Sequence, residues 1–324
     1  MTLLVIGVGS IGLRHIRNLR RIGVTDVTAY DPEPARMTAA GAAGAQPCAT
    51  LAEALARRPR GVLVCTPPTL HLEHAQAALT VGADIFVEKP LAAQPDGVEA
   101  LLDRADRAGR TVTVGYNLRF HPAVRRLKSI VEDRSIGRLL ALRAEFGQYL
   151  PDWRPGQDYR KGYITDAETG GIVLDSSHEL DYIRWLGGEV SAVAAMAGTV
   201  SDLDMAAEDV AMILLRLTSG ALAEVHLDCV QRAYRRGCTM IGTEGTVVWA
   251  YQSGLRRYEA KSRAWVDEPL VVDINETYVA EMTHWLACLR GEATPLVDGR
   301  EGWRVLQVAL AARTAARSRR EVGV

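Results

Sequence analysis

The chain has 324 residues, of which 48% are hydrophobic and 24% charged, and its formal net charge is -1. This length favours two domains, and the balanced charge, with no long block of one sign, gives no support to nucleic-acid or membrane-surface binding. No apolar run is long enough to cross a bilayer, and the start MTLLVIGVG lacks the basic region of a signal peptide. The five cysteines include no C-x-x-C pair, which predicts free thiols, no metal site and a cytoplasmic location.

The first third of the chain alternates short apolar strands with helical segments. The strands are rich in β-branched residues and show no polar face, which is typical of a parallel sheet covered by helices on both sides. We therefore predict a doubly wound α/β domain over residues 1–118. The expected strands lie at 2–9, 26–31, 61–68, 84–90 and 111–117.

After about residue 118 the hydrophobic pattern alternates in period two, as in strands with one buried face. The turn segments TSG and GTEG favour hairpins, so we predict an α+β domain over residues 119–324 with an open, mainly antiparallel sheet. The expected strands lie at 139–150, 190–200, 209–230 and 237–251.

Helices are expected to accompany this sheet. One, from about Asp166 to Leu186, should pack on a face of the sheet, and two more close the chain at 275–291 and 299–320. We expect the last helix to pack back on the first domain. The basic final segment, residues 313–324, is expected to fray and is assigned no function.

A glycine-rich segment, VIGVGSIG, follows the first strand and opens the first helix. Its G-x-G-x-x-G spacing permits a tight turn that presents backbone N–H groups to a pyrophosphate at the helix N-terminus. Asp31 ends the second strand, where its carboxylate can accept from a ribose 2′-OH and repel a 2′-phosphate, which favours NAD over NADP. Arg36 nearby is of the type that can accommodate such a phosphate. The expected pyrophosphate-binding residues are Gly7, Gly9, Ser10, Ile11 and Gly12.

Two later strands end in segments that suit a ligand site, VCTPPTLH and FVEKPLA. Ligands of open α/β sheets bind at the carboxyl ends of the strands, and a lysine placed there is costly unless it touches cofactor or substrate. We predict that these two strand ends contribute to cofactor binding. The residues concerned are Thr66, Pro67, His71, Glu88 and Lys89.

The segment GGIVLDSSHELDYIRWL carries Asp175 and His178 in an otherwise apolar, helix-like run. Histidine suits general-base removal of a hydroxyl proton, and a lysine ammonium stabilises developing alkoxide charge. On a helix, Asp175, His178, Tyr182 and Trp185 share one face, which we expect to look toward Lys89. The sequence therefore predicts Lys89, His178 and Asp175 as catalytic residues.

Five segments together resemble the Gfo/Idh/MocA oxidoreductase family: VIGVGSIGLRH, CTPPTLHLEHAQAAL, VEKPLA, VGYNLRFHPAV and GGIVLDSSHELDYIRWL. The resemblance covers nearly the whole chain. It implies a Rossmann domain followed by an open-sheet domain, and NAD(P)-dependent oxidation or reduction at a carbon of a sugar, cyclitol or related small substrate. It also implies a homodimer or homotetramer formed through the C-terminal sheet.

The resemblance further implies that Lys89 is the family's E-K-P lysine and His178 its active-site histidine. Many members carry the helix aspartate four residues before this histidine. Here position 174 is leucine and Asp175 stands three before His178, a spacing that resembles a subset of the family.

Polar and aromatic residues near the domain junction are the expected substrate contacts. The segment YLPDWRPGQDYRKGYITD could bind a carboxylate, a phosphate or a nucleotide through its cations, or those cations could pair with neighbouring aspartates. Similar segments in family members imply an acidic or nucleotide-linked sugar. The candidates are Asn117, Arg119, Trp153, Arg154, Tyr159, Tyr163 and His178.

Two other functions fit the same motifs. The family also includes NAD-dependent glycosidases, in which transient oxidation of one carbon labilises the glycosidic bond without net turnover of the cofactor. A dinucleotide-binding sensor without catalysis is the third hypothesis, but a sensor needs neither Lys89 nor His178.

Overall fold

A computed structural model describes residues 1–324 and divides into two compact units. The first comprises Met1–Asn117 and Ile274–Arg304, and the second comprises Leu118–Asp273 and Val305–Val324. The helix at Ile274–Leu289 is thus grouped with the first unit, whereas the sequence pattern predicted a single second domain over residues 119–324. No helix combines the length and the apolar character that crossing a membrane requires.

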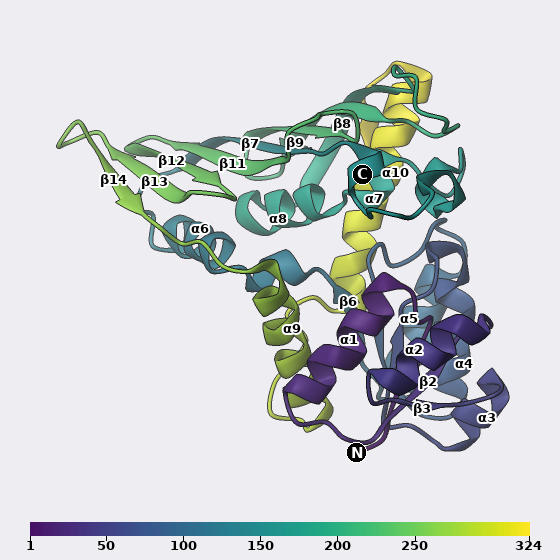
Figure 1. Ribbon diagram of the computed structural model, residues 1–324. Helices are drawn as coiled ribbons and strands as arrows, with labels where there is room; N and C mark the ends of the chain where they lie inside the picture. The colour runs from purple at the N-terminus through teal and green to yellow at the C-terminus, as the bar shows by residue number, and fades with distance from the viewer. The chain divides into compact units, whose positions relative to one another are not determined.

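The first unit is built on a six-stranded parallel sheet in the order β3-β2-β1-β4-β5-β6 (Figure 1). β1, β4 and β5 are buried along their whole length, as expected from the apolar runs LLVI, GVLV and IFV that they contain. β2 and β3 are added on one side of β1, and β4, β5 and β6 on the other, so the carboxyl ends of β1 and β4 flank the switch point of the fold. The predicted doubly wound sheet is confirmed. Its strands are β1 (Leu3–Ile6), β2 (Val27–Tyr30), β3 (Gln46–Pro47), β4 (Gly61–Val64), β5 (Asp84–Glu88) and β6 (Val112–Gly115).

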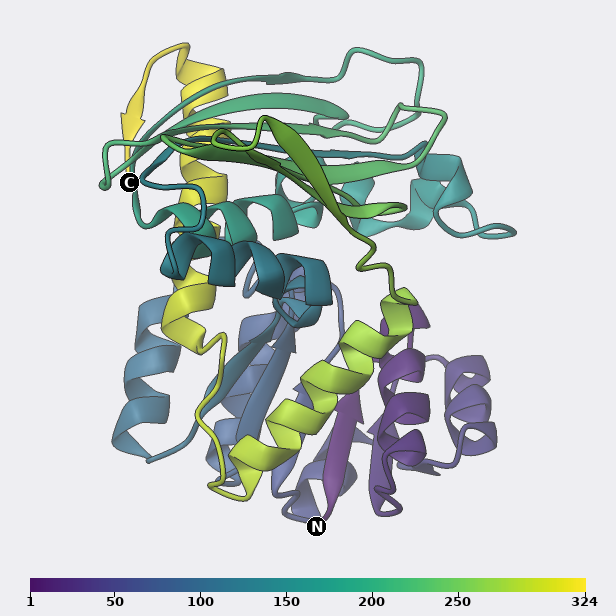
Figure 2. The ribbon, with the colours of Figure 1, turned by 90° about the vertical axis from the view of Figure 1, so that its left-hand side faces the viewer.

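Helices cover both faces of this sheet (Figure 2). On one face α1 lies against α9, and their apolar residues share a core with the strands, in which Trp285 packs edge-on against Phe86. Burial of such a large aromatic side chain stabilises the layer strongly. The helices of the unit are α1 (Ser10–Arg21), α2 (Pro34–Ala42), α3 (Leu51–Ala56), α4 (His71–Thr80), α5 (Val98–Arg107) and α9 (Ile274–Leu289).

The last helix, α10 (Gly299–Ser318), begins in the first unit and continues in the second. Its start packs closely on the edge of the sheet, because Gly302 leaves room for Val114 of β6. Arg300 adds ion pairs to Asp103 (2.6 Å) and Asp106 (2.8 Å) of α5.

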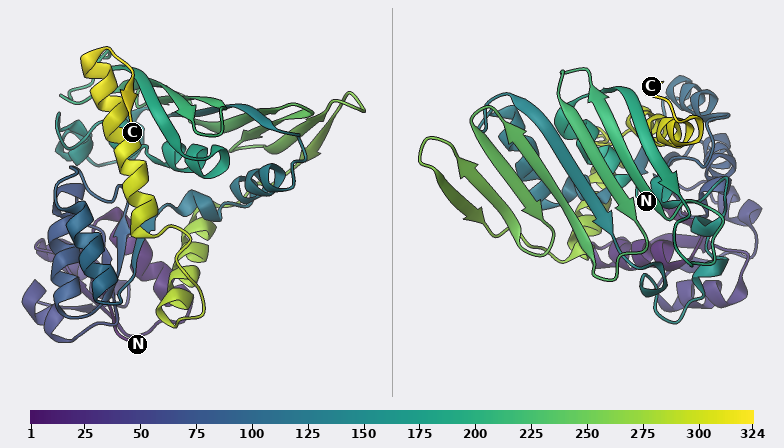
Figure 3. Two further views of the ribbon diagram at one scale, coloured as in Figure 1. Left: turned by 180° about the vertical axis from the view of Figure 1, so that it is seen from behind. Right: turned by 90° about the horizontal axis from the view of Figure 1, so that it is seen from above.

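The second unit contains a nine-stranded sheet in the order β14-β13-β12-β11-β7-β10-β9-β8-β15. β7 and β10 pair in parallel and the other neighbours are antiparallel, which confirms the predicted mainly antiparallel sheet. α7 (Ile172–Asp175) and α8 (His178–Gly187) pack on one face, with α6 (Pro122–Glu132) against α8. Figure 3 shows the other face with no helix over it. The strands are β7 (Leu139–Gly147), β8 (Val190–Gly198), β9 (Val210–Leu217), β10 (Leu222–Asp228), β11 (Arg235–Gly242), β12 (Gly245–Ala250), β13 (Gly254–Glu259), β14 (Ala264–Glu268) and β15 (Val322–Gly323).

Two local predictions for this unit are wrong. The single helix expected over 166–186 is two helices, α7 (Ile172–Asp175) and α8 (His178–Gly187), separated at Ser176 and Ser177 and preceded by short 3-10 turns. The final segment is ordered rather than frayed, because α10 extends to Ser318 and β15 then pairs with β8. Buried Arg313 anchors this helix by donating to the carbonyls of Ala167 and Glu168.

The close packing of α10 on β6 makes a testable prediction. A Cβ at Gly302 would lie 2.5 Å from Val114 Cγ2, so Gly302→Ala should lower the free energy of unfolding by about 1–3 kcal/mol in urea titrations. Gly41, also in a helix, is the matched control, because a Cβ at this position would meet no atom closer than 3.6 Å. Gly41→Ala should be neutral or stabilising by up to about 1 kcal/mol. Equal effects of the two substitutions would contradict the packing argument.

Candidate active site

The glycine loop between β1 and α1 has the shape of an anion cradle. Gly7 has a φ of 87° and passes so close to Cys65 and Thr66 that a Cβ would lie 2.7 Å from their backbone atoms. Gly9 differs, because a Cβ there would meet no atom within 4 Å, so this side of the loop is open to a ligand. α1 begins at Ser10 with neither a side-chain cap nor an acidic residue in its first turn. Its first N–H groups are therefore available to a pyrophosphate.

Asp31 lies at the end of β2 beside this loop and is already well bonded. Its carboxylate accepts from the N–H of Val8 (2.7 Å) and of Glu33 (3.0 Å), and Arg36 approaches to 3.4 Å. A carboxylate offers about four acceptor positions, so one remains for a ribose hydroxyl. Asp31 can thus fix the glycine loop through Val8 and accept a hydrogen bond from a ribose hydroxyl at the same time.

A buried histidine links the ends of β4 and β5. His71 Nδ1 lies 2.9 Å from the carbonyl oxygen of Pro90, and its Nε2 lies 2.8 Å from that of Thr66. Burial lowers the pKa of His71, while its hydrogen bonds to the two carbonyl groups act in the opposite direction. His71 is only 1% exposed, so it can influence a cofactor only through the two loops that it joins. Pro67, in the loop after β4, is exposed and can contact a ligand directly.

The turn after β5 carries Lys89 between Glu88 and Pro90. The Glu88 carboxylate is buried and accepts the backbone N–H of Lys89 at its Oε2 (3.2 Å). Its Oε1 lies 2.6 Å from Nε2 of His15 on α1, a residue that the sequence analysis did not assign to the site. A histidine on the buried face of an otherwise amphipathic helix was the signal that could have identified it.

In the second unit, Asp175 and His178 flank the break between α7 and α8. His178 is the first residue of α8 and is buried, while Asp175 is half-buried and accepts a hydrogen bond from the Tyr163 hydroxyl. Tyr163, expected to contact substrate, is therefore bonded to the aspartate expected to act in catalysis. The break replaces the continuous helical face predicted for Asp175, His178, Tyr182 and Trp185.

Buried polar contacts hold α8, and with it His178, against the sheet. Glu179, fully buried next to His178, pairs with Arg236 of β11 (2.8 Å), and the Tyr182 hydroxyl donates to the Gly237 carbonyl (3.2 Å). Breaking a buried pair of this kind by removing one partner typically costs about 3–5 kcal/mol. The position of His178 is thus set by its neighbours along α8.

Arg119 belongs to this support and is not exposed to solvent. It donates two hydrogen bonds to Asp181 of α8 through Nη2 (2.7 Å) and Nε (3.0 Å), and both side chains are buried. Its guanidinium lies over the Trp185 ring at 5.2 Å. Arg119, an expected substrate contact, therefore has a clear structural role.

The other expected substrate contacts are distributed over both units. Asn117 is buried in the first unit and donates to Thr277 (2.6 Å). In the second unit Trp153 donates to the Gln148 carbonyl (2.9 Å), the Tyr159 hydroxyl accepts the Asp204 N–H (3.1 Å), and Arg154 is exposed.

Local pairing accounts for part of the charge in the segment around these residues. Arg160 forms an ion pair with Asp158 (2.7 Å), which agrees with the expected alternative that cations of this segment pair with neighbouring aspartates.

No group of three or more histidine, cysteine, aspartate or glutamate side chains in the chain could hold a metal ion.

Comparisons with known proteins identify relatives along the whole chain. Residues 1–116 match the family described as "Oxidoreductase family, NAD-binding Rossmann fold", and residues 124–248 match the GFO/IDH/MocA C-terminal domain. An inositol 2-dehydrogenase of Acidothermus cellulolyticus is 28% identical over 337 residues, covering 98% of this chain and 92% of the relative.

Two solved structures share the fold. An oxidoreductase from Agrobacterium radiobacter in complex with NAD+, L-tartaric acid and magnesium has a TM-score of 0.91 at 20% identity, covering 100% of this chain and 98% of that one. The WlbA dehydrogenase from Bordetella pertussis, in complex with NADH and UDP-GlcNAcA, has a TM-score of 0.84 at 24% identity with the same coverage.

The environment of Asp31 makes a prediction about cofactor choice. Asp31→Ser removes the charge that repels a 2′-phosphate but keeps a hydroxyl for the Val8 N–H, and Arg36 is then free of its carboxylate partner. The ratio of kcat/KM for NADP to that for NAD should rise by about tenfold or more. Asp31→Ser combined with Arg36→Ala should lose most of this gain. An unchanged ratio in the single variant would show that Asp31 does not read the ribose.

Proposed function

Because the chain belongs to the Gfo/Idh/MocA family of NAD-binding oxidoreductases, we propose that it transfers a hydride between NAD and a CH–OH carbon of a sugar, cyclitol or sugar-derived substrate. The observation that carries this proposal is the position of Lys89. It follows β5, at the same edge of the parallel sheet as the open glycine loop after β1. That edge is where α/β proteins of this type bind their ligands.

The proposed chemistry divides between two side chains. When bound, the nicotinamide accepts the hydride in oxidation and returns it in reduction. His178 removes the substrate hydroxyl proton in oxidation and donates it in reduction. The Lys89 ammonium stabilises negative charge on the same oxygen. Asp175, held by Tyr163, orients His178 or binds a neighbouring hydroxyl.

We favour an acidic or nucleotide-linked sugar within this substrate class. The segment before α7 contributes the aromatic side chains Trp153 and Tyr159 and the exposed cation Arg154. Such groups suit stacking on a ring and binding of a carboxylate or phosphate. The fold relative WlbA, crystallised with UDP-GlcNAcA, supports this choice.

The cysteines support a reducing environment. All five are buried and free, and burial raises the pKa of the Cys229 thiol to about 12, which keeps it protonated. We therefore propose that the enzyme works in the cytoplasm, where such thiols remain reduced. Fractionation that recovers the enzyme from an oxidising compartment would contradict this proposal.

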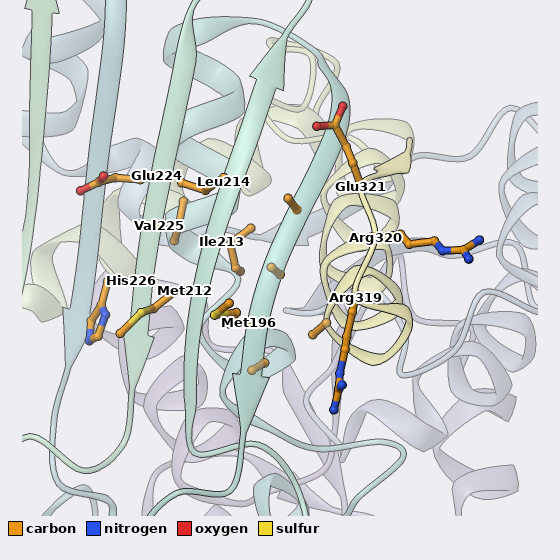
Figure 4. A pocket seen from close by; sticks show the side chains of 14 residues that line it. Met196, Met212, Ile213, Leu214, Glu224, Val225, His226, Arg319, Arg320 and Glu321 are labelled. Atoms are coloured by element: carbon orange, nitrogen blue, oxygen red, sulfur yellow. The ribbon is translucent and has the colours of Figure 1, made fainter.

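We also propose that the uncovered face of the nine-stranded sheet forms a homodimer or homotetramer interface. Met196, Met212 and Leu214 are 81%, 56% and 60% exposed on adjacent strands, and they line an open hollow of about 860 Å³ (Figure 4). Figure 4 shows Met196, Met212 and Leu214 on neighbouring strands, with Arg319 and Glu321 on the segment after α10 at the side of the hollow. A contiguous apolar surface of this kind typically marks an interaction site, and a second copy of the chain is the partner that the family supports.

Replacement of Lys89 tests the proposed reaction. In a panel of sugars, cyclitols, sugar acids and sugar nucleotides, the wild type should reduce NAD with at least one compound. Lys89→Ala should lower that turnover by about 10²-fold or more while leaving NAD binding, measured by calorimetry, largely intact. Lys261→Ala, at an exposed lysine of the β13–β14 turn, is the control and should retain full activity.

Two outcomes would contradict the proposed reaction. Near-normal turnover of Lys89→Ala would remove Lys89 from the mechanism. Release of sugar from glycosides without accumulation of NADH would show transient oxidation in a glycosidase instead of a dehydrogenase.

A charge on the uncovered sheet face tests the interface. Leu214→Arg should convert the oligomer into a monomer near 35.3 kDa in light scattering, because a dry interface cannot accommodate an unpaired guanidinium. Val271→Arg, at an exposed valine outside the strands, should leave the mass unchanged. A monomeric wild type at micromolar concentration, or an oligomeric Leu214→Arg, would overturn the proposal.

A further inference from the structure

A buried histidine on the cofactor helix has no role in the reaction as described so far. His15 lies in the second turn of α1, the helix whose first residues border the glycine loop, and it is 0% exposed. Its Nε2 is 2.6 Å from Oε1 of Glu88, 73 positions further along the chain. Burying an imidazole and a carboxylate together costs desolvation free energy that can exceed their attraction, so the pair calls for an explanation other than stability.

The hydrogen bonds around Glu88 assign the proton in this pair. Its Oε2 accepts the backbone N–H of Lys89, and its Oε1 faces Nε2 of His15. His15 Nδ1 has no hydrogen-bond partner in the chain, and a proton there would be buried without an acceptor. The tautomer that carries its proton on Nε2 avoids this cost, so His15 donates to Glu88 through Nε2.

Tight packing prevents this pair from rearranging. The His15 ring meets Phe86 edge-on at 5.4 Å and Tyr278 at 5.9 Å. On the neighbouring strand β6, a Cβ at Gly115 would lie 3.3 Å from Cδ of Glu88 and 3.0 Å from Phe86. Glu88 therefore fills the space that this glycine leaves, and its carboxylate has little freedom to turn.

We propose that His15 is a positioning residue that acts through Glu88 on Lys89. Its N–H fixes one carboxylate oxygen, and the other oxygen fixes the backbone N–H of Lys89. Glu88 thereby fixes the turn that carries the catalytic lysine relative to the helix that borders the cofactor loop. This inference rests on the proposed function of Lys89, and it adds a residue that touches neither substrate nor cofactor.

Two amide substitutions separate this role from general stabilisation of the fold. In His15→Gln the side-chain amide nitrogen can take the place of Nε2 and donate to Glu88, whereas the shorter amide of His15→Asn cannot reach Oε1. His15→Asn should lower kcat by about tenfold or more, and His15→Gln should keep kcat within about threefold of wild type. The Kd for NAD should change by less than about twofold in both variants, because the glycine loop is untouched. Thr113→Val, a buried change on β6 that removes a hydroxyl without a partner, is the control and should leave kcat unchanged.

A double substitution tests whether the effect passes through Lys89. In the Lys89→Ala background, His15→Asn should lower the residual turnover by less than about twofold, because the group that His15 positions is already absent. If turnover of the double variant falls by the product of the two single-variant factors, the proposal is wrong. Equal kcat in the Asn and Gln variants, or a loss that appears in NAD affinity instead of kcat, would also overturn it. A wild type that reduces NAD with no compound of the panel would instead reject the proposed function, so the two failures are distinguishable.

Discussion

The Glu88 carboxylate is the point on which the first unit's chemistry depends. It lies at the end of a strand that is buried throughout, and it joins His15 of α1 to the backbone of Lys89. A carboxyl group buried in such a place requires hydrogen-bond partners for its oxygens, and the fold supplies one from the cofactor helix and one from the lysine turn. The hydrogen bonds that stabilise the Glu88 carboxyl group in the core therefore also fix the backbone of Lys89.

The second unit applies the same principle to its histidine. α8 bears buried carboxylates immediately after His178, and each has an arginine partner from another element: Glu179 with Arg236 and Asp181 with Arg119. These pairs do not contribute directly to the proposed reaction. They fix the helix whose first residue is His178, so Lys89 and His178 each stand next to a buried carboxylate that is hydrogen-bonded to another element or to the adjacent turn.

The features that could be predicted from sequence are those encoded locally. Continuous apolar runs predicted the parallel strands, and alternation predicted the open sheet, because burial on both faces or on one face leaves that pattern directly. The glycine loop and the Lys89 turn were also visible, since each is a short motif at the end of a strand.

Contacts between distant positions could not be predicted in this way. His15 and Glu88 are 73 positions apart, and Arg119 and Asp181 are 62 apart, so no local pattern links them. The sequence therefore suggested Arg119 as a substrate contact but could not show its pairing with Asp181 of α8. The break at Ser176 and Ser177 could not be predicted for a related reason. Two serines are compatible with a continuous helix, so the sequence does not show that α7 ends before α8 begins.

The reaction proposed for this enzyme is direct movement of a hydride between a substrate carbon and NAD. Transfer of deuterium tests it most directly: each substrate found active should be prepared with deuterium on its CH–OH carbons and oxidised in ordinary water. Direct hydride transfer should give NADH that carries one deuterium at C4 of the nicotinamide, and a turnover slowed by the label where hydride transfer limits the rate. Unlabelled NADH, with the deuterium released to water, would contradict direct hydride transfer at a CH–OH carbon.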